Sequence, residues 1–370
     1  MQAAPHQLLS INLRLNPTYI VQYVERDAAS SCRSTKQLAA ELNLRNNKPL
    51  PVMSCKASKR IRNAVNWLAA SALPKRVYCA ADKRTYSFRL NFITLTLPSL
   101  GLPVSDHQFK SRLLKNFLAR MEYRHGLKNY VWKVETQANG NIHAHLTTDC
   151  FIHWREIRDV WNDLLIKAGF MKQFASLHGH SDPNSTDVKS VRAVKDLAAY
   201  LAKYFSKSEN DRRHVSGRLW SCSYSLSDKN PCSIHLDPHD TLNVLPPLVS
   251  SDCEAINVQS EPDMFGRRRH LATVFFMSPA FWRTLSHSII GRHYAARLNY
   301  IRTGTFASDV FSSHFINSPY VQFDAKPKDS GVVRPSDTIR NQDKSAQSSA
   351  HDFAEVRKRA HQFALQFPCY

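Results

Sequence analysis

A short segment of strictly alternating polarity, residues 141–147, constrains the fold more than any other part of the chain. It alternates three aliphatic with three polar side chains: Ile142, Ala144 and Leu146 against His143, His145 and Thr147. Successive side chains of a β-strand point to opposite faces, so a strand here would bury the aliphatic residues and present both imidazoles on the other face. The pattern predicts a half-buried strand whose two histidines can bind one divalent ion.

The segment before this strand supplies a third metal ligand if the two form a hairpin. Residues 131–137 have the pattern of a strand, and residues 138–140 contain the Asn-Gly turn signal. A three-residue loop, with Gly140 in the left-handed conformation, places Glu135 directly opposite His143 and on the same face. A two-residue loop would shift the register by one and turn Glu135 to the other face.

We favour the three-residue loop because it brings one carboxylate and both imidazoles together, which is a functional argument and not a local one. Glu135, His143 and His145 leave open coordination positions and suit Mg²⁺ or Mn²⁺ acting as a Lewis acid on a phosphate. The alternative is a pair of surface histidines on a half-exposed strand, without a metal.

A second segment, residues 194–207, has the periodicity of an amphipathic helix. At about 100° per residue, one narrow polar arc holds Tyr200, Lys203, Tyr204 and Lys207. A separate apolar stripe, suited to packing on a sheet, holds Val194, Leu197, Ala198, Leu201 and Phe205. Both tyrosines therefore lie outside the expected buried stripe, although ordinary half-buried packing tyrosines are the alternative.

The residue types in the polar arc fit nucleophilic attack on a phosphate. A phenol is a poor nucleophile at its ordinary pKa near ~10, and the ammonium groups of Lys203 and Lys207 would stabilise the phenolate. Attack by Tyr200 or Tyr204 would yield a phosphotyrosine ester, which a 3′-hydroxyl can reseal without ATP. A second tyrosine one turn away would allow a further cut while the first product is still attached.

The charge balance indicates a polyanionic partner. The chain of 370 residues has 50 Lys and Arg against 30 Asp and Glu, a formal net charge of +20. This excess does not distinguish DNA from RNA or from anionic lipid. No apolar run reaches the length of a membrane span, and residues 1–27 lack a signal-peptide core. We therefore expect no membrane partner, a cytoplasmic location and reduced cysteines.

The order of these motifs resembles that of the HUH endonucleases, and most closely the two-tyrosine rolling-circle replication initiators of single-stranded DNA phages and related plasmids. The resemblance spans residues 85–225. Three motifs carry it: a hydrophobic strand with Thr94 and Thr96, the pair His143 and His145 with Glu135 upstream, and a helix in which Tyr200 and Tyr204 each precede a lysine by three residues. A less specific match is residues 217–220, which contain Arg218 and Trp220.

The resemblance implies an enzyme that nicks single-stranded origin DNA by metal-assisted tyrosine attack, forms a 5′-phosphotyrosine adduct and rejoins the strand at termination. It implies catalytic roles for Tyr200, Tyr204, Lys203 and Lys207, binding of Mg²⁺ or Mn²⁺ by Glu135, His143 and His145, and nucleic-acid binding by Thr94, Thr96, Arg218 and Trp220. The sequence has no P-loop motif, so we expect a host helicase to act with a host DNA polymerase, in the cytoplasm of a bacterial host.

The intervening sequence predicts an α+β fold. We expect a strand at 85–97, a helix at 106–123, the two hairpin strands, a helix at 154–168, a strand at 186–191 and then the tyrosine helix. This order builds an antiparallel sheet with packed helices, the split βαβ pattern of an RRM-like HUH endonuclease core. The histidine strand would be central, and the tyrosine helix would lie over its polar face.

Flanking regions are expected on both sides of this core. Residues 1–84 would be basic and partly helical, with a helix at 56–73 that either grips phosphates or is a solvated surface. Residues 226–325 would form a DNA-binding or accessory domain, whose basic and aromatic residues either bind single strands or form an ordinary core with a charged rim. A flexible linker is expected at residues 326–350 and a terminal helix at 351–370.

Other function classes stay open. A two-tyrosine single-strand transposase uses the same site, whereas relaxases usually place their tyrosines before the histidines. The pairs His145 with Thr147 and His214 with Ser216 faintly resemble the repeats of metal-independent 2H phosphoesterases, but lack the hydrophobic residue that should follow each. A non-catalytic nucleic-acid-binding module with an RRM-like sheet is the non-enzyme alternative.

Overall fold

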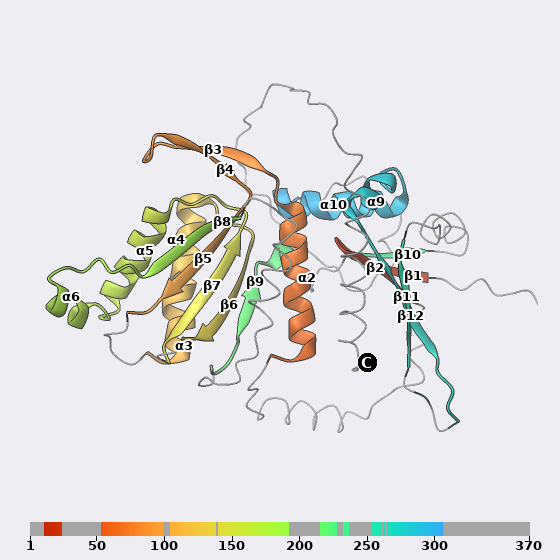
Figure 1. Cartoon of the computed structure of the whole chain (residues 1–370), viewed down its shortest axis with the longest axis horizontal. Coiled ribbons are helices and arrows are strands. Elements are labelled where there is room, and N and C mark those ends of the chain that lie inside the picture. Colours follow the sequence, from red (N-terminus) through yellow and green to blue (C-terminus); the bar gives the residue numbers. More distant parts are fainter. Residues whose placement is uncertain are drawn as a thin grey trace, which may run out of the picture.

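The computed structural model describes residues 11–23, 53–98, 104–137, 140–191, 215–227, 232–236, 253–260, 262 and 265–305. Within these ranges, two five-stranded sheets and a separate two-stranded hairpin are packed with helices (Figure 1). The combination of antiparallel sheets and packed helices confirms the expected α+β class. Among the described helices, none combines the length and the apolar character that crossing a membrane requires.

The central sheet has the strand order β8-β5-β7-β6-β9 and is antiparallel throughout. Its strands are β5 (Leu90–Thr96), β6 (Tyr130–Thr136), β7 (Ile142–Thr148), β8 (Thr186–Val191) and β9 (Trp220–Cys222). Strands β5 and β6 run in the same direction with β7 between them, and helices connect them, so the split βαβ arrangement is confirmed. The histidine strand β7 is central, as predicted.

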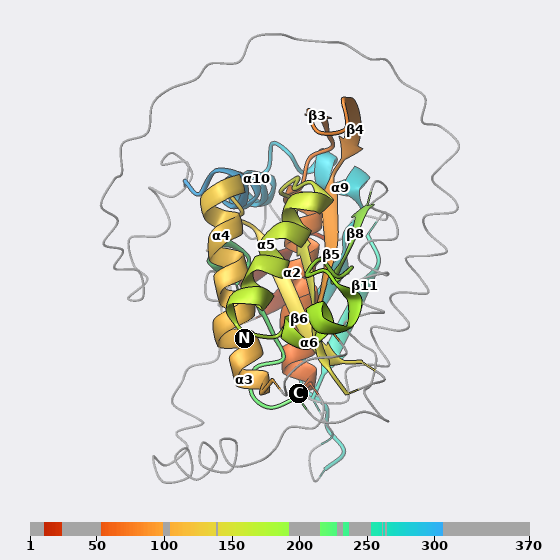
Figure 2. The same ribbon diagram turned by 90° about the vertical axis from the view of Figure 1, so that its left-hand side faces the viewer.

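One face of the central sheet is covered by helices. Between β5 and β6 lie α3 (Asp106–Gln108), the π-helical turn η2 (Phe109–Leu114) and α4 (Lys115–His125), and after β7 come α5 (Trp154–Lys167) and α6 (Lys172–His178). The predicted helices 106–123 and 154–168 are thus confirmed. Helices α4 and α5 lie side by side (Figure 1, Figure 2). They bury the aliphatic side chains of the strands, including Ile93, Val134, Ala144 and Leu146.

Helix α2 (Cys55–Ser71) packs on the opposite face of this sheet, near β6 and β9 (Figure 1). Its apolar residues form a cluster with Leu90, Phe92 and Val131 of the sheet and with residues of η3 (Tyr224–Leu226) and α10 (Ile289–Thr303). The predicted helix at 56–73 is therefore present, and its apolar side packs on the sheet.

The predicted strand 85–97 is wrong in one respect, because the chain changes partners at Arg89. The residues before it form β4 (Arg84–Phe88), which pairs with β3 (Lys75–Cys79) in a separate hairpin. The residues after it form β5, whose neighbours β7 and β8 end opposite its first two residues, at Thr148 and Val191. Backbone groups before Leu90 therefore lie beyond the central sheet and are paired by β3.

The second five-stranded sheet joins residues from both ends of the described chain. Its order is β10-β1-β2-β12-β11, with β1 (Ile11–Asn16), β2 (Tyr19–Tyr23), β10 (Ser233–Leu236), β11 (Ala255–Gln259) and β12 (His270–Phe276). Helices α9 (Pro279–Thr284) and α10 pack against it. Phe275 and Trp282 are buried in its core, whereas Arg267, Arg268 and Arg269 are exposed. Of the two interpretations of this region, an aromatic core with a charged rim fits the structure.

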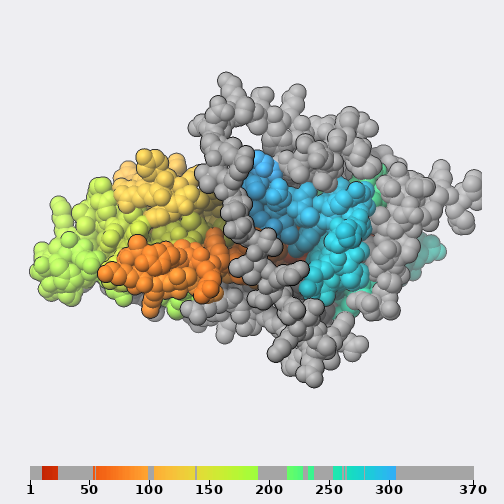
Figure 3. All heavy atoms as spheres, turned by 90° about the horizontal axis from the view of Figure 1, so that it is seen from above, coloured from red at the N-terminus to blue at the C-terminus, as the bar shows by residue number. Residues whose placement is uncertain are grey.

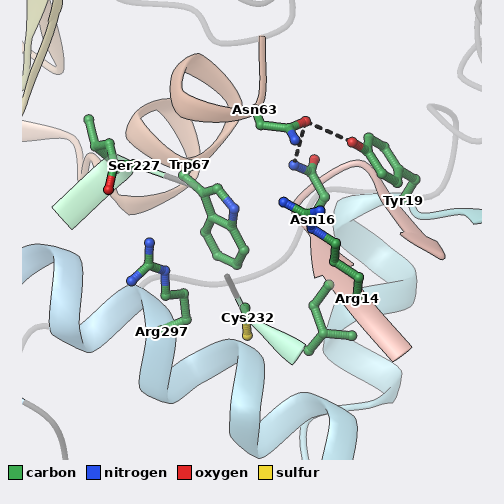
Figure 4. A pocket seen from close by; sticks show the side chains of 10 residues that line it. Arg14, Asn16, Tyr19, Asn63, Trp67, Ser227, Cys232 and Arg297 are labelled. Carbon is green, nitrogen blue, oxygen red and sulfur yellow. Dashed lines mark hydrogen bonds between the residues drawn. The ribbon is translucent and has the colours of Figure 1, made fainter. Parts of the chain in front are cut away.

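A small polar cavity lies where the second sheet meets α2 (Figure 4). Oδ1 of Asn63 accepts hydrogen bonds from the Tyr19 hydroxyl at 2.7 Å and from the Asn16 amide at 3.2 Å. Arg297 of α10 lies over the ring of Trp67, with its guanidinium carbon 5.7 Å from the ring centroid. These contacts tie the N-terminal strands to the helix that packs on the central sheet.

Candidate metal centre and active site

The register of the β6–β7 hairpin brings the three predicted metal ligands to one face. Glu135 lies directly opposite His143. The Gln137 amide donates to the Asn141 carbonyl at 2.7 Å, and Gly140 has a φ of 80°. This is the three-residue loop and not the two-residue alternative, so the predicted convergence of the ligands is present.

The three side chains meet at a single carboxylate oxygen. Oε1 of Glu135 lies 3.0 Å from Nε2 of His143 and 3.1 Å from Nε2 of His145. The ligand atoms that the three residues offer all lie within 4.8 Å of one another. The two imidazole planes are inclined by 65°, so their nitrogens approach from different directions. Two nitrogens and one carboxylate oxygen at this spacing fit a divalent ion, which would replace the two hydrogen bonds.

Burial and hydrogen bonding keep these ligands in the forms that bind a metal. Glu135 and His145 are buried, and His143 is half-buried. Burial alone would raise the pKa of the Glu135 carboxyl, but hydrogen bonds from His143 and His145 hold this pKa well below its usual range. Burial lowers the pKa of His145, against the opposing effect of the Glu135 carboxylate. An ionised carboxylate beside a neutral imidazole is the combination that metal binding requires.

Lys133 belongs to the site but was not among the residues predicted from the sequence. It is buried on the same face of β6, and its Nζ lies 3.7 Å from Oε2 of Glu135. A buried ammonium group is costly unless a negative charge or hydrogen bonds compensate for it. The signal was available in the sequence, because the period of two that selects Glu135 also selects Lys133.

Strand β5 adds two threonines beside the histidines. Thr96 pairs with His143 and Thr94 with His145 in the strand register. Oγ1 of Thr94 lies 3.1 Å from Nδ1 of His145, and the Phe92 ring stacks on the same imidazole with 5.2 Å between centroids. A hydroxyl at Nδ1 fixes the ring orientation and leaves Nε2 for the metal. The nucleic-acid contacts of both threonines stay predictions, at positions next to the metal ligands.

The segment that contains Arg218 and Trp220 lies at one edge of the central sheet. Trp220 begins β9 and pairs with Lys133, so it is on the site face, and its half-buried ring packs against the cluster under α2. Arg218 is exposed, and its carbonyl accepts a hydrogen bond from Lys110 at 3.2 Å. Trp220 therefore lies two strands from the histidines, with Arg218 at the margin.

The predicted catalytic residues lie outside the described part of the chain. All four fall in the connection between β8 and residue 215: Tyr200, Lys203, Tyr204 and Lys207. The described flanks are placed on the sheet and at α3. Val191 ends β8 opposite Leu90, and the Ser216 amide donates to Asp106 at the start of α3. The helical form of the tyrosine segment and its position over the polar face stay predictions.

An α+β sheet that presents a carboxylate and two imidazoles on one face, in a chain with a net charge of +20, defines a candidate metal-dependent nucleic-acid protein. Residues 91–209 match a protein family described as replication-associated protein ORF2. The match begins in β5 and extends past the predicted tyrosine segment. It confirms the resemblance to replication proteins and supports a role in initiating replication. No curated protein and no solved structure matches the chain.

Proposed function

We propose that the protein initiates rolling-circle DNA replication by nicking single-stranded origin DNA and later rejoining the strand. One observation carries the proposal: the hairpin register gathers Glu135, His143 and His145 on the central strand pair, within a segment that matches replication-associated proteins. The net charge of +20 supports a polyanionic substrate, since Lys and Arg contacts to phosphates provide much of the affinity of such proteins.

Glu135, His143 and His145 would hold a divalent ion, Mg²⁺ or Mn²⁺, which when bound polarises the scissile phosphate as a Lewis acid. Thr94 would orient the His145 ring through its hydroxyl. The ammonium group of Lys133 would offset part of the charge on Glu135 before the ion binds. Thr96, Arg218 and Trp220 would contact the DNA strand along the same face and its margin.

Tyr200 and Tyr204 would be the nucleophiles, and Lys203 and Lys207 would stabilise the phenolate and the phosphate. The phenolate oxygen attacks phosphorus, the bond from phosphorus to the 3′ oxygen breaks, and the departing oxygen takes up a proton. The products are a 5′-phosphotyrosine adduct and a free 3′-hydroxyl. Attack of a 3′-hydroxyl on the adduct reverses these changes, restores the phosphodiester and frees the tyrosine without ATP.

Other proteins would complete the replication cycle. A host polymerase would extend the free 3′-hydroxyl, and a host helicase would separate the strands, because the sequence contains no P-loop motif. We place this cycle in the cytoplasm of a bacterial host. The second sheet, with exposed Arg267, Arg268 and Arg269, would serve as an accessory DNA-binding unit.

Incubation with single-stranded oligonucleotides that cover candidate origin sequences tests the proposal. The 3′ label should migrate with the protein on a denaturing gel in Mn²⁺ or Mg²⁺ and should not do so in EDTA. The variant with His143→Ala and His145→Ala should bind DNA without cleaving it, because phosphate contacts persist. Full cleavage by this variant would overturn the metal site. Cleavage in EDTA without an adduct would indicate a phosphoesterase, and binding without cleavage by the wild type would indicate a non-catalytic module.

A further inference from the structure

A second group of metal-ligating side chains lies apart from the proposed active site. Cys79, Asp82 and His153 bring one thiol, one carboxylate and one imidazole within 4.8 Å of one another. His153 follows the end of β7 at Thr148, whereas the active-site histidines lie in the first half of that strand. The two groups share no residue.

The β3–β4 hairpin supplies two of these side chains through its turn. Cys79 pairs with Arg84 as the last strand pair, and residues 80–83 form the turn. Lys83 has a φ of 51°, in the left-handed region that tight turns use. Cys79 and Asp82 are therefore presented together by a short loop. Their spacing, with two residues between the ligands, is the one that zinc sites commonly use.

His153 supplies the third side chain from a distant segment. It precedes α5 as the N-cap residue, and its Nε2 lies 2.8 Å from Oδ2 of Asp82, 71 residues away in sequence. The Asp82 carboxylate also accepts a hydrogen bond from the Tyr86 hydroxyl at 2.5 Å, and Nε of Arg84 donates to that hydroxyl at 2.7 Å. Metal sites commonly hold their ligating carboxylates in this way, with outer hydrogen bonds that fix the ligand orientation.

We propose that Cys79, Asp82 and His153 bind a structural Zn²⁺ ion. Zinc accepts thiolate sulfur, imidazole nitrogen and carboxylate oxygen together, whereas Mg²⁺ and Mn²⁺ prefer sites rich in oxygen. Cys79 and His153 are buried, and the turn beside them is largely exposed, so an ion can enter from solvent. Three protein ligands leave the fourth tetrahedral position to a water molecule.

The hairpin has a structural need for such an ion. Only Cys79 and Phe88 are buried among the residues of β3 and β4, and the hairpin forms a ridge on the surface (orange in Figure 3). A two-stranded hairpin is marginally stable by itself in water. Phe151 contacts the rings of Tyr86 and Phe88 along the hairpin. The zinc ion fixes its turn to the start of α5, which these ring contacts do not reach.

Cobalt substitution of the full-length protein tests this proposal. Co²⁺ takes the same tetrahedral geometry as Zn²⁺, and a thiolate ligand adds a sulfur-to-metal charge-transfer band in the near ultraviolet. The proposed active site contains no thiol, so Co²⁺ bound there gives no such band. We expect about one equivalent of Co²⁺ per chain to produce the band, and Zn²⁺ to abolish it by displacement.

Single variants assign the band to the three residues. Cys79→Ser should abolish it, and His153→Gln should weaken Co²⁺ binding by roughly tenfold or more. Cys150→Ser is the matched control and should keep the band, because Cys150 is half-buried nearby with its Sγ donating to the His125 carbonyl. Absence of the band from the wild type, or its persistence in Cys79→Ser, would overturn the proposal.

X-ray absorption of the zinc-loaded wild type makes the test independent of variant folding. We expect one sulfur scatterer at roughly 2.3 Å together with nitrogen and oxygen scatterers. A shell of nitrogen and oxygen alone contradicts the proposal. Either result leaves the proposed nicking reaction untouched, because the two groups of ligands are separate.

Discussion

The two faces of the central sheet are made from the same strands, yet one is a core and the other holds a site. The face under α4 and α5 carries buried aliphatic side chains such as Val134, Ala144 and Leu146. The opposite face carries apolar residues only where α2 packs, and carries Glu135 and both histidines beyond that helix. Because side chains alternate, each ligand lies next to a core residue. The core face therefore fixes the register, and the register fixes the geometry of the site.

The polar face differs from an ordinary solvated face because its charged groups are buried. Lys133, Glu135 and His145 are all largely inaccessible, and each has a charged or hydrogen-bonding neighbour. Polar groups in such surroundings are rigid when they are satisfied and costly when they are not. The comparison thus separates two properties: the helix-covered face provides stability, and the polar face provides chemistry.

The largest effect is expected from removing the nucleophiles that the polar face needs. A variant with both Tyr200→Phe and Tyr204→Phe should form no covalent adduct on a denaturing gel, because no phenolate remains. Each single variant should nick single-stranded origin DNA but should not release closed unit-length circles. Termination requires a second tyrosine while the first holds the 5′ end, and α-carbons one helical turn apart are about 6 Å from each other. A single variant that releases circles at the wild-type rate would show that its tyrosine is structural.

A large effect on stability is expected from the core face alone. Leu146→Ala should lower the free energy of unfolding by about 2–5 kcal/mol, because it leaves a cavity under α4 and α5. His143→Ala, on the polar face of the same strand, should change it by about 1 kcal/mol and abolish cleavage. Urea denaturation of both variants measures the difference. Equal losses of stability would remove the proposed division between the faces.

A smaller effect on metal affinity is expected from the hydroxyl beside His145. Thr94→Val keeps the shape of the side chain but removes the group 3.1 Å from Nδ1 of His145. Affinity for Mn²⁺ should fall by roughly 10–100-fold, and Thr94→Ser should retain most of it. Titration with Mn²⁺ measures both values. An affinity that is unchanged in Thr94→Val would mean that the hydroxyl does not orient the ring.

The smallest effect is expected at the loop that sets the register. Gly140 has a φ of 80°, and no neighbouring atom lies within 4 Å of the position that a β-carbon would take, so a side chain meets only conformational strain. Gly140→Ala should cost about 1 kcal/mol of stability in urea denaturation, and Gly140→Asn should cost less because asparagine tolerates this conformation. Neither variant should change the rate of nicking by much. A gain in stability from alanine would point to a different loop conformation.

Local patterns were enough to predict the part of the fold that holds the site. Alternation at residues 141–147 and the Asn-Gly signal depend only on neighbouring residues, and both are present as a central strand and a hairpin. The choice between two loop lengths required the functional argument that three ligands should converge. The same alternation marked Lys133, whose burial depends on β9 and α2, elements far away in sequence.

Long-range pairings were the part that the sequence did not reveal. The break at Arg89 depends on where β7 and β8 end, and the pairing of β2 with β12 joins segments about 250 residues apart. The proposed zinc ligands combine a turn with a histidine 71 residues further along. A search for pairs of cysteines does not find them, because Asp82 stands where a second cysteine would be expected. Such contacts are set by tertiary packing and leave no periodic signal.

The most direct test of the account is the number of Mn²⁺ ions that the polar face binds. Electron paramagnetic resonance of free Mn²⁺ should show one bound equivalent per chain for the wild type, and none at the same concentrations for Glu135→Gln or His145→Ala. Glu122→Gln, which changes an exposed carboxylate on α4, is the matched control and should bind as the wild type does. Loss of the bound equivalent in the two ligand variants alone is the predicted result. Unchanged binding by Glu135→Gln would contradict the claim that the hairpin register assembles the metal site.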